Sequence, residues 1–483
     1  MNVEVAGHSG AAAAAFDMPL ARLIGREPVA CHSRTTVVDA VARMHEAGVG
    51  SMVVADEHAR LQGIFTLHDL RALVAQGADL SQSIAAVMTR EPAALDADAS
   101  TVEAVLLMGE RGIRHVVVTR DGRLAGVVSE RDLFALKRVD VVDLMRRIDA
   151  APSVDALAAS RGEVWRLLDA LMTNGASAHH ITRVLTLLND HTVARVTELC
   201  RQQAPEPPVA FTWVAFGSEG RCEQTLLTDQ DNGIVFEAPD SEVDGVRHQL
   251  LPLAQSINDA LAHCGFQRCP ANIMAGNPEL CLSRREWAAR FETLIATNTP
   301  ENLLSSSIYF DLRAIDGPAG PVATLRQDLL ECSQGNSLFR RMMAANAMQQ
   351  RPPLGWLQDF ATQRDEQGGR SLDLKKGGLT PFVDGARLLS LEGGIDETNT
   401  ARRLAAVAEA GLMDPEAADA WSDAFAFLQW QRLVRHQELS RRGEPLTNRL
   451  DPKRLNALDR HVLKASFRQA RDLQKRLAVR YQL

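Results

Sequence analysis

The feature that most limits how this chain can fold is an internal repeat in its first third. Residues 28–54 align with residues 92–118 at an offset of 64, and residues 59–70 align with residues 122–133 at an offset of 63. A fixed period means that one folding unit is used twice. Each copy joins a segment with apolar residues at helical spacing to two strand-like runs. We therefore predict that each copy folds as strand, helix, two strands, helix.

Both copies end in the same short motif: glycine, two apolar residues, serine or threonine, two residues, aspartate. It stands as Gly63, Thr66 and Asp69 in the first copy and as Gly126, Ser129 and Asp132 in the second. The repeat resembles a pair of cystathionine-beta-synthase-type (CBS) domains, from residue 19 to about residue 139. In that family the hydroxyl contacts phosphate and the carboxylate contacts the ribose of an adenine nucleotide. The resemblance implies AMP, ADP or ATP as a ligand and a homodimer formed through the CBS domains.

The same motif residues also fit a purely structural role. Thr66 and Ser129 are good N-caps, because a hydroxyl at the start of a helix accepts a hydrogen bond from a free backbone N–H. Asp69 and Asp132, three residues later, complete capping boxes. The motif alone does not separate ligand binding from capping, so both interpretations stay open.

A second informative segment, GSEGRCEQTLLTDQDNGIVF, spans residues 217–236. Two carboxylates, Asp229 and Asp231, are spaced to point to one face of a strand, because side chains alternate with period 2. Such a pair can hold Mg²⁺ or Mn²⁺ against a triphosphate. The turn at Gly217 and Ser218 can offer backbone N–H groups and a hydroxyl to the phosphates. The combination predicts nucleotidyl transfer from a nucleoside triphosphate (NTP).

In this segment the Gly-Ser turn is followed, after ten residues, by a D-x-D motif. This arrangement resembles the pattern of the polymerase-beta-like nucleotidyltransferase superfamily. The finer resemblance, through Gly220-Arg221-x-Glu223 and the segment 373–387, is to the protein-PII uridylyltransferase group. The chain also resembles a bacterial family of CBS-pair proteins with a nucleotidyltransferase domain of unknown function, over about residues 155–480. These resemblances imply transfer of a nucleoside monophosphate onto a protein hydroxyl, with the acceptor protein unknown.

The superfamily mechanism also implies a third carboxylate on a neighbouring strand. Asp311 lies in a strand-like run, where an acidic residue is disfavoured without a role. The resemblance implies that Asp311 holds a second metal ion and helps to deprotonate the attacking hydroxyl. The alternative is a buried ion pair with Arg313 or an aspartate at a strand end.

Two cations are candidates for phosphate binding. Arg221 can pair with phosphate bidentately, and Lys375 can reach the same charge. Lys375 is equally well explained as part of a solvated helix start. Glu223 is expected to be structural, tying down the loop through Arg221.

The bulk properties exclude some classes of function. The net charge of −8 argues against a protein that binds nucleic acid by bulk charge. No run reaches the ~18 apolar residues that a membrane helix needs. Seven cysteines show no C-x-x-C spacing, which fits a reduced, cytoplasmic setting.

The predicted fold class is multidomain α/β and α: a tandem CBS pair of βαββα repeats, a polymerase-beta-like α/β nucleotidyltransferase domain and a C-terminal helical bundle. The expected domains are a flexible N-terminus (1–18), CBS domains (19–78 and 79–140), a helical connector (141–205), the nucleotidyltransferase domain (206–335) and the C-terminal helical domain (336–483). Three functions stay open: an NTP-dependent enzyme that the CBS pair regulates, a nucleotide-binding signalling module without turnover, and a small-molecule nucleotidyltransferase.

Overall fold

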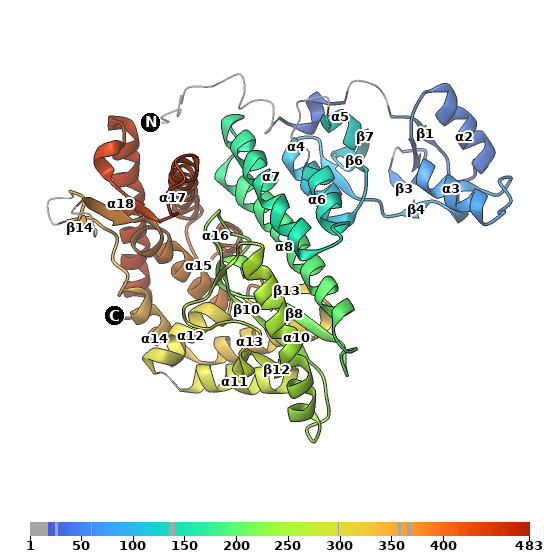
Figure 1. Cartoon of the computed structure of the whole chain (residues 1–483). Coiled ribbons are helices and arrows are strands. Elements are labelled where there is room, and N and C mark those ends of the chain that lie inside the picture. Colours follow the sequence, from blue (N-terminus) through green and yellow to red (C-terminus); the bar gives the residue numbers. More distant parts are fainter. Residues whose placement is uncertain are drawn as a thin grey trace. The chain divides into compact units, whose positions relative to one another are not determined.

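The computed structural model describes most of the 483 residues. The described residues are 18–24, 28–58, 60–134, 141–297, 299–355, 359–364 and 369–483. The predicted flexible N-terminus, apart from its last residue, lies outside them. The chain divides into two compact units, the first running to Arg146 and including 166–176, the second holding 147–165 and 177–483 (Figure 1).

The first unit contains the two sequence repeats. The first repeat consists of β1 (Ala30–Cys31), α2 (Val37–Glu46), β2 (Ser51–Ala55), β3 (Leu61–Thr66) and α3 (Leu67–Ala75). The second consists of β5 (Ala94–Asp96), α4 (Thr101–Arg111), β6 (His115–Arg120), β7 (Arg123–Ser129) and α5 (Glu130–Phe134). In each, the middle strand pairs parallel to the first and antiparallel to the third. The predicted order of elements is confirmed.

The start of the described chain packs on the second repeat, although the sequence assigned it to the first CBS domain. Leu20 is fully buried in one apolar cluster with Ala104 and Met108. The N–H of Leu20 donates to the carbonyl oxygen of Ala99 at 2.8 Å. The segment 18–24 therefore crosses over from its own repeat, a connection that a linear alignment of the two copies does not reveal.

Three helices follow the repeats: α6 (Val141–Asp149), α7 (Val154–Thr173) and α8 (Ala178–Gln203). α7 and α8 are separated by a short break at which Gly175 has a φ of +79°, a backbone conformation that glycine adopts readily. α8 ends just before Pro205, because proline cannot continue a helix. Helices therefore occupy most of residues 141–203, within the range for which the sequence predicts a helical connector.

The second unit is built on a four-stranded sheet with the order β12-β10-β8-β13. The strands are β8 (Phe211–Ala215), β10 (Asn232–Phe236), β12 (Cys281–Ser283) and β13 (Arg313–Asp316). β10 is antiparallel to β8 and parallel to β12. The central strands β8 and β10 are buried at every position, as their continuous apolar runs predict.

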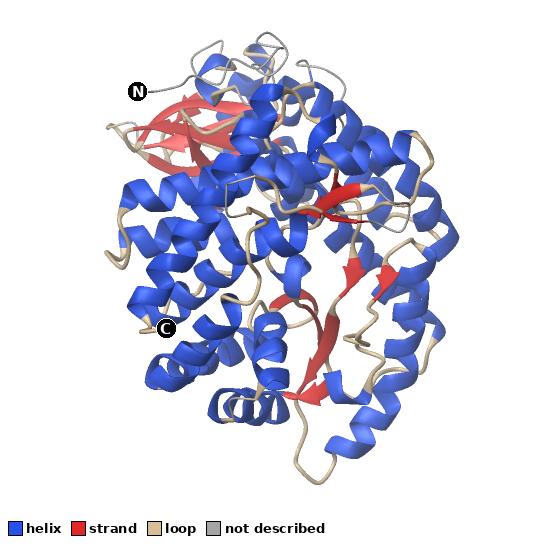
Figure 2. Cartoon of the chain, turned by 90° about the vertical axis from the view of Figure 1, so that its left-hand side faces the viewer, coloured by secondary structure: helices blue, strands red, loops and turns tan. Residues whose placement is uncertain are grey.

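Helices make up most of the second unit (Figure 2). Around the sheet lie α10 (Val243–His263), α11 (Arg284–Ala296), α12 (Pro300–Tyr309) and α13 (Gly320–Gly335). The C-terminal helices are α14 (Ser337–Ala347), α15 (Thr380–Gly393), α16 (Thr400–Glu409), α17 (Pro415–Arg441) and α18 (Ala457–Arg480). Short strands complete the unit: β9 (Asp229–Gln230) with β11 (Gln267–Arg268), and β14 (Gln363–Arg364) with β15 (Arg370–Asp373) and β16 (Arg449–Leu450).

One apolar core joins the sheet to the C-terminal helices. It includes Val235 of β10 together with Trp421 and Phe467 of the C-terminal helices. Trp421, Phe425 and Leu428, whose spacing of i, i+4 and i+7 places them on one face of a helix, are all buried. The predicted fold class is therefore confirmed. The transferase-like sheet and the C-terminal helices share one hydrophobic core. No helix among the described residues is long and apolar enough to cross a membrane.

Candidate active site

The turn after β8 is shaped by two glycines of the short helix α9 (Gly217–Gly220). Gly217 has a φ of +55°, and a Cβ there would lie 3.0 Å from Asp231 Oδ2. A Cβ on Gly220 would lie 1.7 Å from the carbonyl oxygen of Asp311, a distance that no side chain tolerates. The N–H of Phe216 donates to the carbonyl oxygen of Asp231 at 2.8 Å. The structure thus brings the Gly-Ser turn directly against Asp231.

Asp229 begins β9 and Asp231 lies between β9 and β10, so the two aspartates, called here the carboxylate pair, do not share the single strand that their spacing predicted. The alternating side chains of Gln230 and Asn232 are buried. Asn258 of α10 donates from Nδ2 to Gln230 Oε1 at 2.8 Å and to Asn232 Oδ1 at 3.0 Å. Gln230 Nε2 donates to the carbonyl oxygen of Asn258 at 3.1 Å. This buried amide network fixes which way the carboxylates point.

The carboxylate pair has the character of a cation site. Burial is the main cause that raises the pKa of Asp231, and the negative charge of Asp229 adds to the rise, while the thiol of Cys269 donates a hydrogen bond that opposes it. A bound divalent cation would relieve both the burial of charge and the repulsion. No three His, Cys, Asp or Glu side chains gather into a metal cluster within the described ranges. Two carboxylates suit an ion such as Mg²⁺, which takes one or two carboxylates plus substrate phosphates.

Lys375 reaches the carboxylate pair from the C-terminal region. Its Nζ lies 4.0 Å from Asp229 Oδ2. Lys375 belongs to the π-helical turn Leu374–Leu379, whose start Asp373 caps by accepting from the N–H of Lys375 at 2.8 Å. The structure therefore places the predicted Lys375 at the site, on a capped turn rather than on a solvated helix start alone.

Arg432 of α17 is a second cation near the pair, and the sequence analysis did not identify it. It is 4% exposed, and its Nε donates to Asn448 Oδ1 at 2.6 Å. Burial lowers the pKa of Arg432 to about 10, although the negative charges of Asp373 and Asp229 act to raise it. Burial likewise lowers the pKa of Lys375, and the charge of Arg432 lowers it further. The two cations therefore lie close enough to repel each other.

A signal for Arg432 was present in the sequence. Trp421, Phe425 and Leu428 form the core-facing stripe of α17, and Arg432 continues that stripe four residues further on. His436 follows after one more turn and is fully buried; burial first, and then Arg432, lowers its pKa to about 3. Charged residues are rarely buried without a role, so a charged residue on an apolar stripe marks a functional candidate.

Asp311 lies elsewhere than the sequence predicted. It occupies a turn after α12, two residues before β13 begins, so the prediction that it lies inside a strand is wrong. Its carboxylate is completely buried. Oδ2 accepts from Arg221 Nη1 and from Arg387 Nη2, each at 2.6 Å, and Oδ1 accepts from Arg403 Nη1 at 2.7 Å.

This arrangement occupies the carboxylate of Asp311 with cations. Burial alone would raise its pKa, but the charges of Arg387, Arg403 and Arg221 together hold the pKa well below its usual range. In this arrangement both oxygens of the Asp311 carboxylate accept hydrogen bonds from arginines. Neither oxygen is therefore free to bind a metal ion at the carboxylate pair. The residues join the sheet to α15 and α16, since Arg387 and Arg403 belong to those helices.

Arg221 is engaged by the same cluster. Besides its bond to Asp311, its Nε donates to Glu223 Oε2 at 2.7 Å. A bidentate contact between Arg221 and phosphate is therefore not open in this arrangement. Glu223 does tie down the loop through Arg221, as expected, and its Oε1 also accepts from the N–H of Thr400 at 2.7 Å.

Arg313 pairs with a helix of the connector instead of with Asp311. Its Nη1 and Nη2 donate to Asp190 Oδ2 at 2.7 Å and Oδ1 at 2.9 Å, and Nη2 also donates to the carbonyl oxygen of Glu219 at 3.0 Å. Glu219 is 3% exposed. Burial, assisted by the charge of Asp190, raises the pKa of Glu219 to about 8.

A cavity in the first unit is lined by residues of one of the two CBS motifs. It has a volume of about 810 Å³ and is lined by Ser129 and Asp132 together with residues of the first repeat such as Gly50. This size suits a nucleotide. Ser129 and Asp132 also form a capping box, with Ser129 Oγ donating to Asp132 Oδ2 at 2.6 Å. Thr66 and Asp69 form the equivalent capping box, in which Thr66 Oγ1 donates to Asp69 Oδ2 at 2.9 Å.

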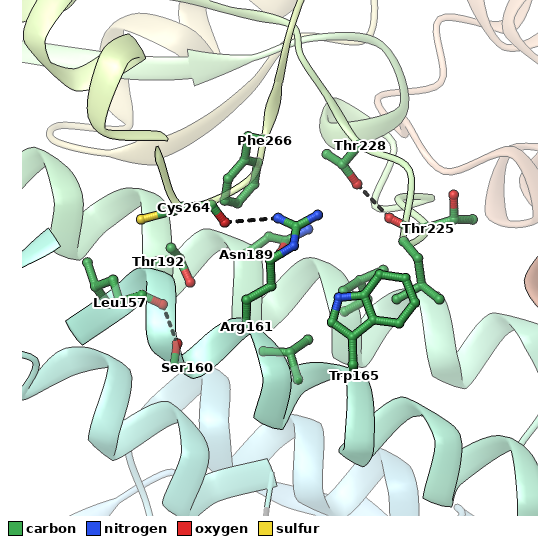
Figure 3. A pocket seen from close by; sticks show the side chains of 13 residues that line it. Leu157, Ser160, Arg161, Trp165, Asn189, Thr192, Thr225, Thr228, Cys264 and Phe266 are labelled. Atoms are coloured by element: carbon green, nitrogen blue, oxygen red, sulfur yellow. Dashed lines mark hydrogen bonds between the residues drawn. The ribbon is translucent and has the colours of Figure 1, made fainter. Parts of the chain in front are cut away.

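A smaller cavity lies where α7 and α8 approach the segment before β9 (Figure 3). Arg161 of α7 donates from Nη1 to the carbonyl oxygen of Cys264 at 2.9 Å, and Thr228 donates to the carbonyl oxygen of Thr225 at 2.6 Å. Its volume of about 40 Å³ has room for a water molecule or two and not for a nucleotide. This cavity is therefore too small to be the nucleotide site.

Family comparisons match three parts of the chain. Residues 162–301 match the family described as "Putative nucleotidyltransferase DUF294", and residues 337–481 match the "Putative nucleotidyltransferase substrate binding domain". Residues 20–76 and 84–138 match the CBS domain family. The carboxylate pair lies in the first match, and Lys375 and Arg432 lie in the second.

Curated relatives match about a fifth of the chain. They include an uncharacterised 17.7 kDa protein of Acidianus ambivalens, 32% identical over 20% of this chain and 60% of that protein, and the arabinose 5-phosphate isomerase KdsD of Pseudomonas aeruginosa, 38% identical over 21% of this chain and 31% of that enzyme. In both cases the match spans less than two thirds of the relative.

Among solved structures, a CBS domain protein of Pyrobaculum aerophilum complexed with AMP is 26% identical, with a TM-score of 0.25, and the match covers 27% of this chain and 99% of that one. A CBS-domain protein of Agrobacterium tumefaciens is 31% identical, with a TM-score of 0.23, over 24% of this chain and 98% of that one. This chain therefore carries, in order, a CBS domain pair, a domain that matches the putative nucleotidyltransferase family DUF294 and a domain that matches the putative nucleotidyltransferase substrate-binding family.

Proposed function

We propose that this chain transfers a nucleoside monophosphate from an NTP onto a hydroxyl group of another protein, and that its CBS pair senses an adenine nucleotide. One observation carries the proposal: the Gly-Ser turn, the carboxylate pair and Lys375 converge from separate parts of the chain. Anion-binding groups and metal-binding groups side by side are what a triphosphate and its metal ion require.

The chemistry assigns a task to each residue. Asp229 and Asp231 would hold Mg²⁺ or Mn²⁺, which neutralises triphosphate charge when bound. Gly217 and Ser218 would offer backbone N–H groups and a hydroxyl to a phosphate. Lys375 would balance the remaining negative charge. The acceptor hydroxyl oxygen then forms a bond to the α-phosphorus, the bond to the bridging oxygen breaks, pyrophosphate leaves, and the hydroxyl proton passes to solvent.

The C-terminal helices are proposed to present the acceptor. They carry the match to a substrate-binding domain, and they share one apolar core with the transferase-like sheet. The resemblance to the protein-PII uridylyltransferase group favours a protein hydroxyl as the acceptor. The nucleotide base is not assigned by these observations.

Labelling tests the proposal. The full chain is incubated with α-labelled ATP, GTP, CTP or UTP, with Mg²⁺ or Mn²⁺, and with lysate of the native cells. We expect a labelled protein that disappears with Asp231→Asn. Asp240→Asn is the matched control, because Asp240 is 68% exposed and its ion-pair partner within the described part of the chain is the surface residue Arg285. Equal labelling by Asp231→Asn, or no transfer with any of the four nucleotides, contradicts the proposal.

A second candidate is a nucleotide-binding module without turnover. The observation that favours it is Asp311, whose two carboxylate oxygens accept hydrogen bonds from three arginines. Calorimetry separates the two candidates: NTP binding that depends on the carboxylate pair, without release of pyrophosphate, supports the module.

The sensing role is proposed for the cavity beside Ser129 and Asp132. Its volume of about 810 Å³ and its carboxylate suit the ribose of AMP, ADP or ATP. A homodimer through the CBS domains is proposed from the family resemblance, and sedimentation of the full chain tests it.

A further inference from the structure

We propose that Arg432 and Lys375 together bind the β- and γ-phosphates of the NTP and stabilise them as they leave as pyrophosphate. The inference rests on the proposed function and extends it. It assigns the leaving group to side chains of the C-terminal helices, while the Gly-Ser turn and the carboxylate pair belong to the sheet. The same residues would then decide whether the site accepts a triphosphate or a monophosphate.

A single asparagine fixes both cations. Asn448 Oδ1 accepts from Arg432 Nε at 2.6 Å, and its carbonyl oxygen accepts from the N–H of Leu374 at 3.0 Å. Leu374 begins the π-helical turn that carries Lys375. Because side chain and backbone of one residue hold the arginine and the turn, the two cations keep a fixed spacing, which is the preorganisation that anion binding needs.

Arg432 lacks the partner that the other buried arginines have. Arg221, Arg387 and Arg403 each bind Asp311. Arg432 is 4% exposed, and among the described residues no carboxylate lies within ion-pair distance of it. A buried charge without a partner is costly, so such a group is retained where a ligand supplies the opposite charge. Neither Nη of Arg432 donates a hydrogen bond to a described residue.

The position of the cations favours the leaving group over the α-phosphate. The Gly-Ser turn contacts Asp231, whereas Lys375 approaches Asp229. A triphosphate bound along the carboxylate pair would therefore lie beside the Gly-Ser turn near Asp231 and beside the two cations near Asp229. When the acceptor oxygen bonds to the α-phosphorus, the electron pair of the broken bond goes to the bridging oxygen of pyrophosphate. Positive charge is most effective where this negative charge develops.

Binding of inorganic pyrophosphate tests the inference without requiring turnover. Calorimetry with Mg²⁺ and pyrophosphate is carried out on the wild-type chain, on Arg432→Gln and on Arg435→Gln. Arg435 lies on the same helix but donates to the carbonyl oxygen of Arg449 and to Glu438. We expect Arg432→Gln to weaken pyrophosphate binding by roughly tenfold or more, equal to the loss of a charge-assisted hydrogen bond, and Arg435→Gln to leave it unchanged.

Nucleoside monophosphates serve as the second probe. They lack the β- and γ-phosphates, so we expect Arg432→Gln to bind them as the wild type does. Lys375→Gln, at a side chain that is 43% exposed, should give the same pattern and guards against a folding defect at the buried site. Thermal unfolding of each variant records its stability.

The possible outcomes distinguish a failure of this inference from a failure of the proposed function. If both Arg432→Gln and Lys375→Gln bind pyrophosphate like the wild type, the inference is overturned while the proposed transferase stands. If both variants lose monophosphate and pyrophosphate equally, the cations do not select the leaving group, and the inference also fails. If the wild-type chain binds neither an NTP nor pyrophosphate in the presence of Mg²⁺ or Mn²⁺, the inference and the proposed function fall together.

Discussion

Arg387 binds Asp311 through two hydrogen bonds, from Nη2 to Oδ2 at 2.6 Å and from Nε to Oδ1 at 3.2 Å, with both side chains closed to solvent. Arg387 belongs to α15 and Asp311 lies before β13, so the pair ties the C-terminal helices to the transferase-like sheet. A buried ion pair is a weak source of net stability, but breaking one side of it leaves an uncompensated charge.

The first prediction follows from this pair. Asp311→Ala should lower the free energy of unfolding by about 3–5 kcal/mol, because three arginines lose their common acceptor. Denaturant unfolding followed by circular dichroism measures the effect. Asp229→Ala is the control, since Asp229 keeps 35% of its side chain exposed and approaches a single cation at 4.0 Å.

The contrary result is equally informative. If Asp311→Asn keeps wild-type stability and yet abolishes Mg²⁺ or Mn²⁺ binding, the arginines are not its main partners in solution. Asp311 would then be the third metal ligand that the family resemblance implies, and α15 and α16 would have to move to release it.

The second prediction concerns Asp231. Burial and the charge of Asp229 disfavour its ionised form, so Asp231→Asn should leave the metal-free protein as stable as the wild type or more stable by about 1 kcal/mol. The same variant should lose the rise in melting temperature that Mg²⁺ and NTP give to the wild type. A variant that is less stable and keeps that rise contradicts a metal-binding role for Asp231.

Much of the fold was predictable because its signals are local. The repeat at an offset of 64, the apolar stripe ending at Leu428 and the alternation around Asp231 each reflect a periodicity that the sequence displays. The structure adds why that alternation matters, since Gln230 and Asn232 are buried in one amide network with Asn258.

What the sequence did not predict depends on contacts between distant residues. Asp311 is paired with Arg387 and Arg403, which lie 76 and 92 positions further along the chain, and no spacing rule selects these over the nearby Arg313. Arg432 was missed for the same reason. Its meaning depends on Asn448 and on the turn carrying Lys375, which only the folded chain brings together.

The third prediction distinguishes the two CBS motifs. Ser129 and Asp132 line the large cavity of the first unit, so Asp132→Ala in the full chain should weaken binding of AMP, ADP or ATP by roughly tenfold or more. Asp69→Ala removes an acceptor from Thr66 in a capping box and should lower stability by about 1 kcal/mol. Calorimetry and thermal unfolding of both variants measure the two effects.

For this prediction the adverse result is a clear one. If Asp132→Ala binds every adenine nucleotide as the wild type does, the cavity is not the sensor, and the motif in the second repeat acts only as a helix cap. If Asp69→Ala causes the loss of binding instead, the ligand occupies the other half of the CBS pair.

The fourth prediction is a dependence of stability on pH through Glu219. Its folded pKa is about 8, raised from the usual 4.5 chiefly by burial. Between these values the folded chain keeps a proton that the unfolded chain has released. Stability must therefore fall as the pH rises through this window, by at most about 1.4 kcal/mol for each pH unit.

Glu219→Gln isolates this effect, because a glutamine is neutral at every pH and nearly the same size. The difference in unfolding free energy between variant and wild type should grow in favour of the variant from pH 5 to pH 8 and level off above it. Urea unfolding at half-unit pH steps measures that difference, in which contributions from other titrating groups cancel. Parallel curves for the two proteins would mean that Glu219 is ionised in the folded state, stabilised by Arg313, which donates to its backbone carbonyl.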